Sequence, residues 1–254
     1  MIKLICITKR NLPFFISLSS LSLASSFVFF LFYGIIWPLF FSFFIFIFII
    51  FLWFFSLTRE FLIGWEYINI EDSIKFGIIL FILSEVCFFL SFFWTFFVNG
   101  LSSSSFLGEC FPPVGIQPIP PFSVPFLNTI ILLSSSLTLT LWHNLFECGK
   151  ENKSPLIITI LLAFYFSYLQ FQEYKFASFS ISDSSFGSIF FLATGFHGFH
   201  VILGTLLLIV VLFRSYIYYT DIFSHPFIEI SVWYFHFVDV VWLFLFSFFY
   251  WWGG

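Results

Sequence analysis

The sequence predicts an all-α membrane protein with seven transmembrane helices, and three observations support this. Of the 254 residues, 61% are apolar and only 9% are charged, whereas soluble domains carry about 25% charged residues. The apolar residues gather in stretches close to the ~20 residues that a helix needs to cross a bilayer. Eight of the nine basic residues fall on one side of the membrane when these stretches alternate in direction.

The transmembrane segments follow the runs of Phe, Leu, Ile and Val along the chain. They cover residues 12–33, 35–56, 74–98, 126–146, 155–176, 186–214 and 228–251. Gly34 and Pro38 predict a tight turn between the first two segments. Residues 57–73 form a charged inner loop. Residues 99–125 form an outer loop that holds six of the ten prolines, a density that favours extended backbone.

The basic residues predict the orientation, because lysine and arginine accumulate on the inner side of a membrane. With the N-terminus inside, only Lys175 lies on an outer connection. The other eight lie inside: Lys3, Lys9, Arg10, Arg59, Lys75, Lys150, Lys153 and Arg214. We therefore expect the N-terminus inside and the C-terminus outside.

One carboxyl interrupts the third segment. Glu85 lies halfway along an otherwise uncharged stretch, Phe76 to Val98, where a charged side chain costs about 2.5–3.5 kcal/mol. A stripe of small residues runs beside it, formed by Ser84, Cys87, Ser91 and Thr95. Two interpretations stay open. Glu85 is either a proton-linked or lipid-headgroup site, or a protonated carboxyl that hydrogen-bonds a neighbouring helix.

Two histidines in the sixth segment have a spacing that raises the possibility of a metal or haem site. His197 and His200 are three residues apart, so both rings lie on one side of the helix. Haem or metal binding requires further ligands, and no other His or Cys cluster accompanies them. The alternative, which we favour, is hydrogen bonding to another helix, with Gly195, Gly198 and Gly204 allowing close packing.

The seventh segment contains a second polar pair. His236 and Asp239 are also three residues apart, and pairing lowers the cost of keeping both in lipid. A proton relay is the alternative. The sequence has no G-x-S-x-G, P-loop or C-x-x-C motif and no basic face for nucleic acid. We therefore predict neither a catalytic centre nor a metal site in this chain.

Several polar and aromatic residues lie near the ends of the segments. Glu173 lies beside Lys175 near the outer end of its segment. Its side chain can extend to the outer interface there and keep its charge in water, which explains a charged residue at this position. The terminal aromatic residues predict an interfacial belt at the outer surface; they are Tyr250, Trp251 and Trp252. Arg59 and Arg214 lie at inner helix ends, where they either bind lipid phosphate or act as plain orientation anchors.

The chain resembles the cytochrome c oxidase subunit III family in four long strings. They are SEVCFFLSFFWTF (84–96), CFPPVGIQPIPPFSVPFLNT (110–129), ISDSSFGSIFFLATGFHGFHVILGTLLL (181–208) and WYFHFVDVVWLFLFSFFYWWG (233–253). The resemblance runs from about residue 74 to the C-terminus, while residues 1–56 match only as two apolar spans. Ser91, Phe235 and the pair Trp142–His143 depart from the usual family residues.

The resemblance implies helices 1 and 2 (residues 1–56) splayed from the bundle of helices 3–7 (residues 74–254), with phospholipid in the V-shaped cleft between them. Glu85 matches the carbodiimide-reactive glutamate of the family, and Trp53, Arg59 and Arg214 match lipid-contacting positions. The chain itself would bind no haem or copper, which belong to subunits I and II. The N-terminus would face the mitochondrial matrix and the C-terminus the intermembrane space.

The function that follows is that of an accessory, non-redox subunit of cytochrome c oxidase in the mitochondrial inner membrane. Its partners would be subunits I and II, accessory subunits and phospholipid. The 48 phenylalanines suggest a T-rich organelle genome. One rival is a stand-alone proton or ion transporter that uses the intramembrane polar residues named above, but no internal repeat supports it. A second rival is the matching subunit of a bacterial quinol oxidase.

Overall fold

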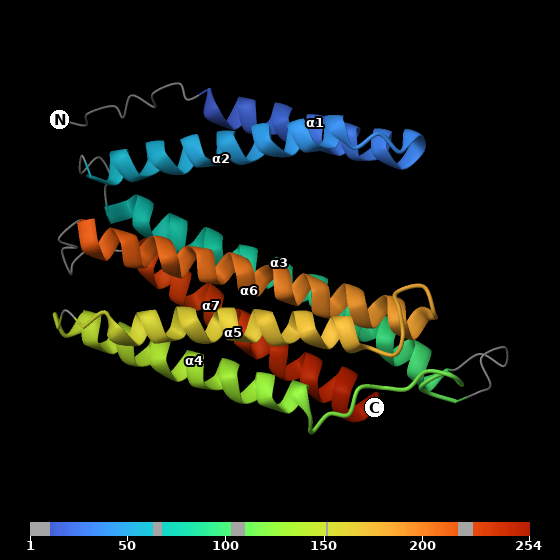
Figure 1. Ribbon diagram of the computed structural model, residues 1–254. Helices are drawn as coiled ribbons and strands as arrows, with labels where there is room; N and C mark the ends of the chain where they lie inside the picture. The colour runs from blue at the N-terminus through green and yellow to red at the C-terminus, as the bar shows by residue number, and fades with distance from the viewer. Residues whose placement is uncertain (1–10, 63–67, 103–109, 151, 218–225) are drawn as a thin grey trace. The chain divides into compact units, whose positions relative to one another are not determined.

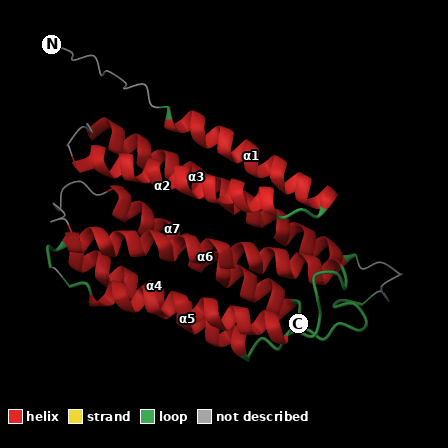
Figure 2. Cartoon of the chain, turned by 45° about the horizontal axis from the view of Figure 1, so that its top comes forward, coloured by secondary structure: helices red, strands yellow, loops and turns green. Residues whose placement is uncertain are grey.

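All regular structure in the described residues is helical, which confirms the predicted class (Figures 1 and 2). The computed structural model describes residues 11–62, 68–102, 110–150, 152–217 and 226–254, without the side chains at 54, 57–62, 68–72, 217 and 226. In these ranges lie α1 (Leu12–Tyr33), α2 (Trp37–Leu62), α3 (Ile68–Leu101), α4 (Val124–Glu147), α5 (Ser154–Phe176), α6 (Ser185–Ile217), α7 (Pro226–Leu245) and the π-helix η2 (Phe246–Trp252).

The helices agree with the predicted segments at most boundaries. Six of them, counted over the described residues, are long and apolar enough to cross a membrane. The described apolar part of α2, Trp37–Trp53, is shorter, so a seventh span remains a prediction. Both α2 and α3 extend into the connection 57–73, because α2 ends at Leu62 and α3 begins at Ile68.

The chain divides into two compact units, residues 1–71 and 72–254. In the first unit, α1 and α2 form an antiparallel hairpin (Figure 1). Gly34 ends α1 in the left-handed conformation, with φ of 70°, which glycine adopts without steric cost. Small residues let the two backbones approach: Ser19, Ser26 and Ser42 are buried, and the hydroxyls of Ser26 and Ser42 lie 2.6 Å apart. This hydrogen bond joins the two helices where lipid offers no partner.

In the second unit, α4, α5, α6 and α7 form a ring in which each helix packs on the next and α7 returns to α4. The α3 backbone stays further away, and phenylalanine rings fill the space between. Phe96 stacks on Phe249 with ring centroids 4.1 Å apart, and Phe88 meets Phe196 edge-on at 5.0 Å. Many of the 48 phenylalanines therefore have a packing role, since aromatic pairs add to burial when arranged in this way.

The wide turn of η2 brings two consecutive side chains into the bundle. Phe249 and Tyr250 are each 1% exposed, whereas Trp251 is 66% exposed. The predicted aromatic belt is therefore wrong for Tyr250, which lies in the core. A π-helical segment changes the register of the helix face, and sequence periodicity gives no sign of that change.

The glycines of α6 differ in how closely other groups approach them. A Cβ at Gly204 would lie 3.1 Å from a ring carbon of Phe235, so this glycine does allow close packing of α6 on α7. At Gly198 no other group of the described residues lies within 4 Å of the position that a Cβ would take, so close packing at this glycine stays a prediction. Gly187, in the first turn of α6, has the closest approach of the four glycines in this helix. A Cβ there would collide with the carbonyl oxygen of Ser180.

We expect Gly187→Ala to destabilise the bundle. Overpacking against backbone costs about 1–3 kcal/mol, and the better helix propensity of alanine returns about 0.5–1 kcal/mol. The net loss should be on the order of 1 kcal/mol, measured as a lower thermal midpoint of the solubilised protein. Gly198→Ala is the matched control and should raise the midpoint slightly. A higher midpoint for Gly187→Ala would contradict the packing described here.

Candidate intramembrane site

The carboxyl of Glu85 on α3 meets His200 on α6. Its Oε2 lies 2.9 Å from Nε2 of His200. The two residues are far apart in sequence, and the antiparallel course of α3 and α6 brings them to a similar depth. The His200 side chain is 9% exposed and that of Glu85 is 21% exposed. The geometry therefore pairs a carboxyl and an imidazole that no sequence motif links.

The backbone fixes which nitrogen of His200 carries a proton. Its Nδ1 lies 2.6 Å from the carbonyl oxygen of Phe196. A carbonyl oxygen only accepts, so Nδ1 carries a hydrogen and donates it. The bond between Nε2 and Glu85 then requires one further proton, held by the carboxyl or by the ring. In both cases the pair has no net charge, which reduces the cost of keeping it within a membrane.

Aromatic rings surround the pair on the side of the bundle. Phe89 lies 5.3 Å from the His200 ring, centroid to centroid, and Tyr234 stacks on the ring at 6.3 Å. Phe89 and Tyr234 are both buried. These rings come from α3 and α7, so the pair sits where three helices meet. On this side the rings cover the hydrogen bond, which strengthens it because water does not compete there.

His197 faces a different helix from His200. Its Nε2 lies 3.2 Å from the carbonyl oxygen of Val238 on α7 and donates to it. The ring is 1% exposed and packs against Trp242, with ring centroids 5.1 Å apart. The two histidines thus have separate partners. Within the described ranges, no group of three His, Cys, Asp or Glu side chains is arranged to hold a metal.

His236 bonds across to α4 instead of along its own helix. Its Nδ1 lies 2.9 Å from the hydroxyl of Ser136 and 3.8 Å from Oδ2 of Asp239. The second distance exceeds a hydrogen bond, so the expected His236–Asp239 pair is a loose contact. A serine–histidine–aspartate relay needs serine and aspartate on opposite ring nitrogens. Here both lie at Nδ1, so this group is not built as a nucleophilic triad.

Glu173 on α5 is a buried acid. Glu173 is 6% exposed, and its Oε1 accepts a hydrogen bond of 2.6 Å from the hydroxyl of Tyr250 on η2. Its second oxygen has no partner among the residues that the structure describes. The interpretation that Glu173 reaches the outer interface is therefore wrong. Glu173 and Tyr250 both lie within a few positions of the C-terminal ends of their helices, α5 and η2, and this equal depth was the available signal.

The three predicted lipid-contacting residues differ in how far the structure describes them. Trp53 is half-buried on α2. Arg214 lies in the last turn of α6, with its guanidinium 5.3 Å from the ring centroid of Phe227. The side chain of Arg59 lies outside the described residues. The basic residues Lys3, Lys9 and Arg10, which supported the predicted orientation, lie outside them as well.

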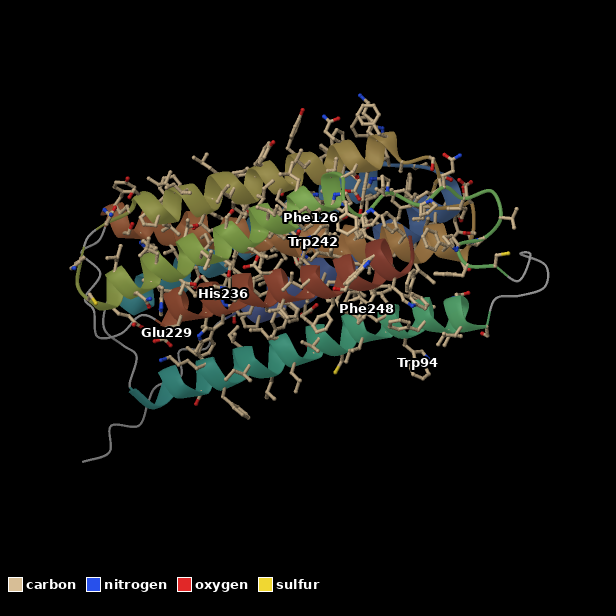
Figure 3. All side chains as sticks on the ribbon, turned by 90° about the horizontal axis from the view of Figure 1, so that it is seen from below. Trp94, Phe126, Glu229, His236, Trp242 and Phe248 are labelled. Atoms are coloured by element: carbon tan, nitrogen blue, oxygen red, sulfur yellow. The ribbon has the colours of Figure 1, made fainter. Side chains whose placement is uncertain are left out.

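Together, the fold and these contacts define a multi-pass helical membrane protein in which Glu85, Glu173 and His236 are hydrogen-bonded to side chains of other helices. Figure 3 shows His236 on α7 among the side chains of the second unit. The family model of cytochrome c oxidase subunit III matches residues 4–254. Cytochrome c oxidase subunit 3 of Myxine glutinosa is 48% identical over 206 residues, covering 80% of this chain and 78% of the relative. The Arabidopsis thaliana protein of the same name is 47% identical over 205 residues, covering 80% and 77%. The chain belongs to the cytochrome c oxidase subunit III family.

Proposed function

We propose that this chain is an accessory, non-redox core subunit of cytochrome c oxidase in the mitochondrial inner membrane. The whole complex would transfer electrons from cytochrome c to oxygen and pump protons, with haem and copper held by subunits I and II. The observation that carries the proposal is the Glu85–His200 pair. Both nitrogens of His200 are engaged by hydrogen bonds, which suits a proton-holding or structural site better than metal ligation.

The pair supports a role in proton supply. It holds one exchangeable proton between two groups whose protonation can interchange without a change in net charge. The Glu85 side chain keeps 21% exposure, so its carboxyl is reachable from outside the bundle. In this proposal Glu85 passes protons toward the uptake path of subunit I, and His200 keeps the carboxyl in place.

A second element of the proposal is phospholipid binding. Helices 1 and 2 would splay from helices 3–7 and enclose lipid, with Trp53, Arg59 and Arg214 at its headgroups and upper chains. Family membership supports this arrangement, and guanidinium groups bind phosphate in a bidentate manner. The N-terminus would face the matrix and the C-terminus the intermembrane space, as the basic residues predict. Bound lipid would help to hold the chain against subunit I.

We expect Glu85→Gln to leave the haem spectra of the purified complex unchanged. Glutamine still bonds to Nε2 of His200, but it cannot exchange a proton, so steady-state turnover should fall several-fold. Absorption spectroscopy and oxygen consumption on the same sample measure the two effects. Glu147→Gln, an exposed carboxyl at the end of α4, is the control and should change neither.

Three results would contradict the proposal in whole or in part. Loss of haem or copper from the Glu85→Gln complex would show that the chain supports the redox centres directly. Proton flux through the purified chain alone in liposomes would favour an autonomous transporter. Unchanged turnover in the Glu85→Gln complex would exclude a role of Glu85 in proton supply and leave the Glu85–His200 pair with a structural role alone.

A further inference from the structure

A pocket of about 310 Å³ lies at the end of the second unit where α5 ends and α4 begins. Two stretches of chain form its wall: residues 117–124, which lead into α4, and residues 172–178, at the end of α5. The hydroxyl of Ser178 donates a hydrogen bond of 2.8 Å to the carbonyl oxygen of Gln117 and joins the two stretches. Figure 1 shows the connection before α4 and the end of α5 at the same end of the unit. The volume falls within the range of small-molecule sites, about 300–1,000 Å³.

Glu173 is the only ionisable residue among the described residues that line this pocket. The residue is 6% exposed, and its Oε1 accepts the hydrogen bond from Tyr250. Its Oε2 has no hydrogen-bond partner among the described residues. A buried carboxyl oxygen without a bond is costly, and here no Lys, Arg or His of the described wall offsets the charge. A cation in the pocket would supply that charge.

The other polar groups of the wall mostly accept hydrogen bonds. Pro118 and Pro120 have no N–H to donate. The hydroxyl of Ser123 donates its hydrogen to the carbonyl oxygen of Pro120 at 2.7 Å, and the hydroxyl of Ser178 is used in the same way by Gln117. Both hydroxyl oxygens therefore keep only their acceptor capacity toward a ligand. A wall of acceptors around one carboxyl favours a ligand that is positive and donates hydrogen bonds.

The remaining wall is apolar, with Ile119, Val124 and Phe176 among its residues. A bound calcium ion takes six to eight oxygen ligands, several of them carboxylates. Within the described ranges, no group of three His, Cys, Asp or Glu side chains could hold a metal. The single carboxylate balances one positive charge. The pocket has the volume of about ten water molecules at ~30 Å³ each, so a cation with a short carbon chain fits it.

We propose that this pocket binds a small organic ammonium ion. Its positive charge is attracted by Glu173, its N–H groups donate to the acceptors of the wall, and its carbon chain lies against the apolar side chains. The ammonium group can belong to a free amine or to the headgroup of a phospholipid. All the groups involved belong to this chain, so such binding does not depend on the oxidase role proposed above.

Photolabelling of the purified complex tests the proposal. The probe is n-butylamine that carries a photoreactive diazirine on its chain, and n-butanol with the same diazirine is the control without charge. After irradiation, mass spectrometry locates the adducts. We expect the amine to label residues 117–124 and 172–178 several-fold more than the alcohol does. An excess of plain n-butylamine should suppress this labelling, and an excess of n-butanol should not.

Three variants separate charge from shape. Glu173→Gln keeps an acceptor for the Tyr250 hydroxyl and removes the charge, so amine labelling should fall several-fold, to the level of the alcohol. Asp183→Asn removes an exposed carboxylate from the connection after α5 and should label like the unmodified chain. Ser178→Phe changes an exposed residue of the wall and leaves the carboxyl in place. It should lower the labelling by filling the pocket, which keeps the test valid if Glu173→Gln does not fold.

Added lipids distinguish the two sources of the ammonium group. Suppression of labelling by phosphatidylethanolamine, but not by phosphatidylglycerol, which has no amine, would identify a lipid headgroup as the ligand. Labelling that neither lipid reduces would identify a free amine. Equal labelling by the amine and the alcohol, equal suppression by both lipids, or unchanged amine labelling in Glu173→Gln would overturn the proposal.

Discussion

Replacing His200 with leucine is expected to lower the free energy of unfolding by about 3 kcal/mol. Removing one member of a buried pair typically costs about 3–5 kcal/mol, because the other member loses its partner. Glu85 keeps 21% side-chain exposure, which places the loss at the lower end of that range. The carboxyl can take up a proton and become neutral, but its O–H then faces leucine, which accepts no hydrogen bond.

The double variant Glu85→Leu/His200→Leu is the matched control. Removing both polar groups leaves no unpaired one, and such replacements are often close to neutral. Thermal midpoints of the solubilised complex should therefore fall clearly for His200→Leu and recover in the double variant. Equal losses in the single and double variants would show that the cost lies in packing and not in the broken pair.

The second large effect is expected for Tyr250→Phe. Its hydroxyl is the hydrogen-bond partner of Glu173 Oε1, and the other carboxyl oxygen already has none among the described residues. Phenylalanine keeps the ring in the core and leaves the buried carboxyl without any bond. A buried polar group that loses its partner costs about 1–3 kcal/mol, and more when it is charged. We expect a loss near 2–3 kcal/mol, measured by thermal or denaturant unfolding of the solubilised complex.

Tyr168→Phe controls for the chemical change, since it removes the same hydroxyl from an α5 tyrosine that is 57% exposed. It should have almost no effect. Adding Glu173→Leu to Tyr250→Phe should restore much of the lost stability, because both polar groups are then gone. If Tyr250→Phe behaved like Tyr168→Phe, the hydrogen bond to Glu173 would contribute nothing to stability.

Features that depend on neighbouring residues in the sequence are easier to predict than contacts between residues far apart in the chain. Gly34 and Pro38 marked the turn between α1 and α2, because backbone preference acts within a few residues. Glu85 stands out in the sequence because a carboxyl in an apolar run is costly wherever it lies. The spacing of His236 and Asp239 on one helix predicts that they pair, but it gives no sign of Ser136, which is 100 positions away from His236.

The depth of each polar residue in the membrane only partly indicates which residues pair. Glu85 lies 11 residues from the inner end of its predicted segment and His200 lies 14 from the inner end of its own, and several other polar residues lie at similar levels. Equal depth therefore allows a Glu85–His200 pair without selecting it. The choice depends on which face of each helix turns toward which neighbour.

The helical membrane class, the approximate spans, the intramembrane carboxyl and the family resemblance are all visible in the amino-acid sequence, because hydropathy, charge and long motifs are properties of consecutive residues. The contacts of Glu85 with His200, of Tyr250 with Glu173 and of His236 with Ser136 depend on how the helices pack in three dimensions. These helices are apolar on nearly every side, so no sequence pattern marks the face that packs. Close packing of aromatic rings and small residues between helices fixes each rotation, and those contacts join residues far apart in the chain.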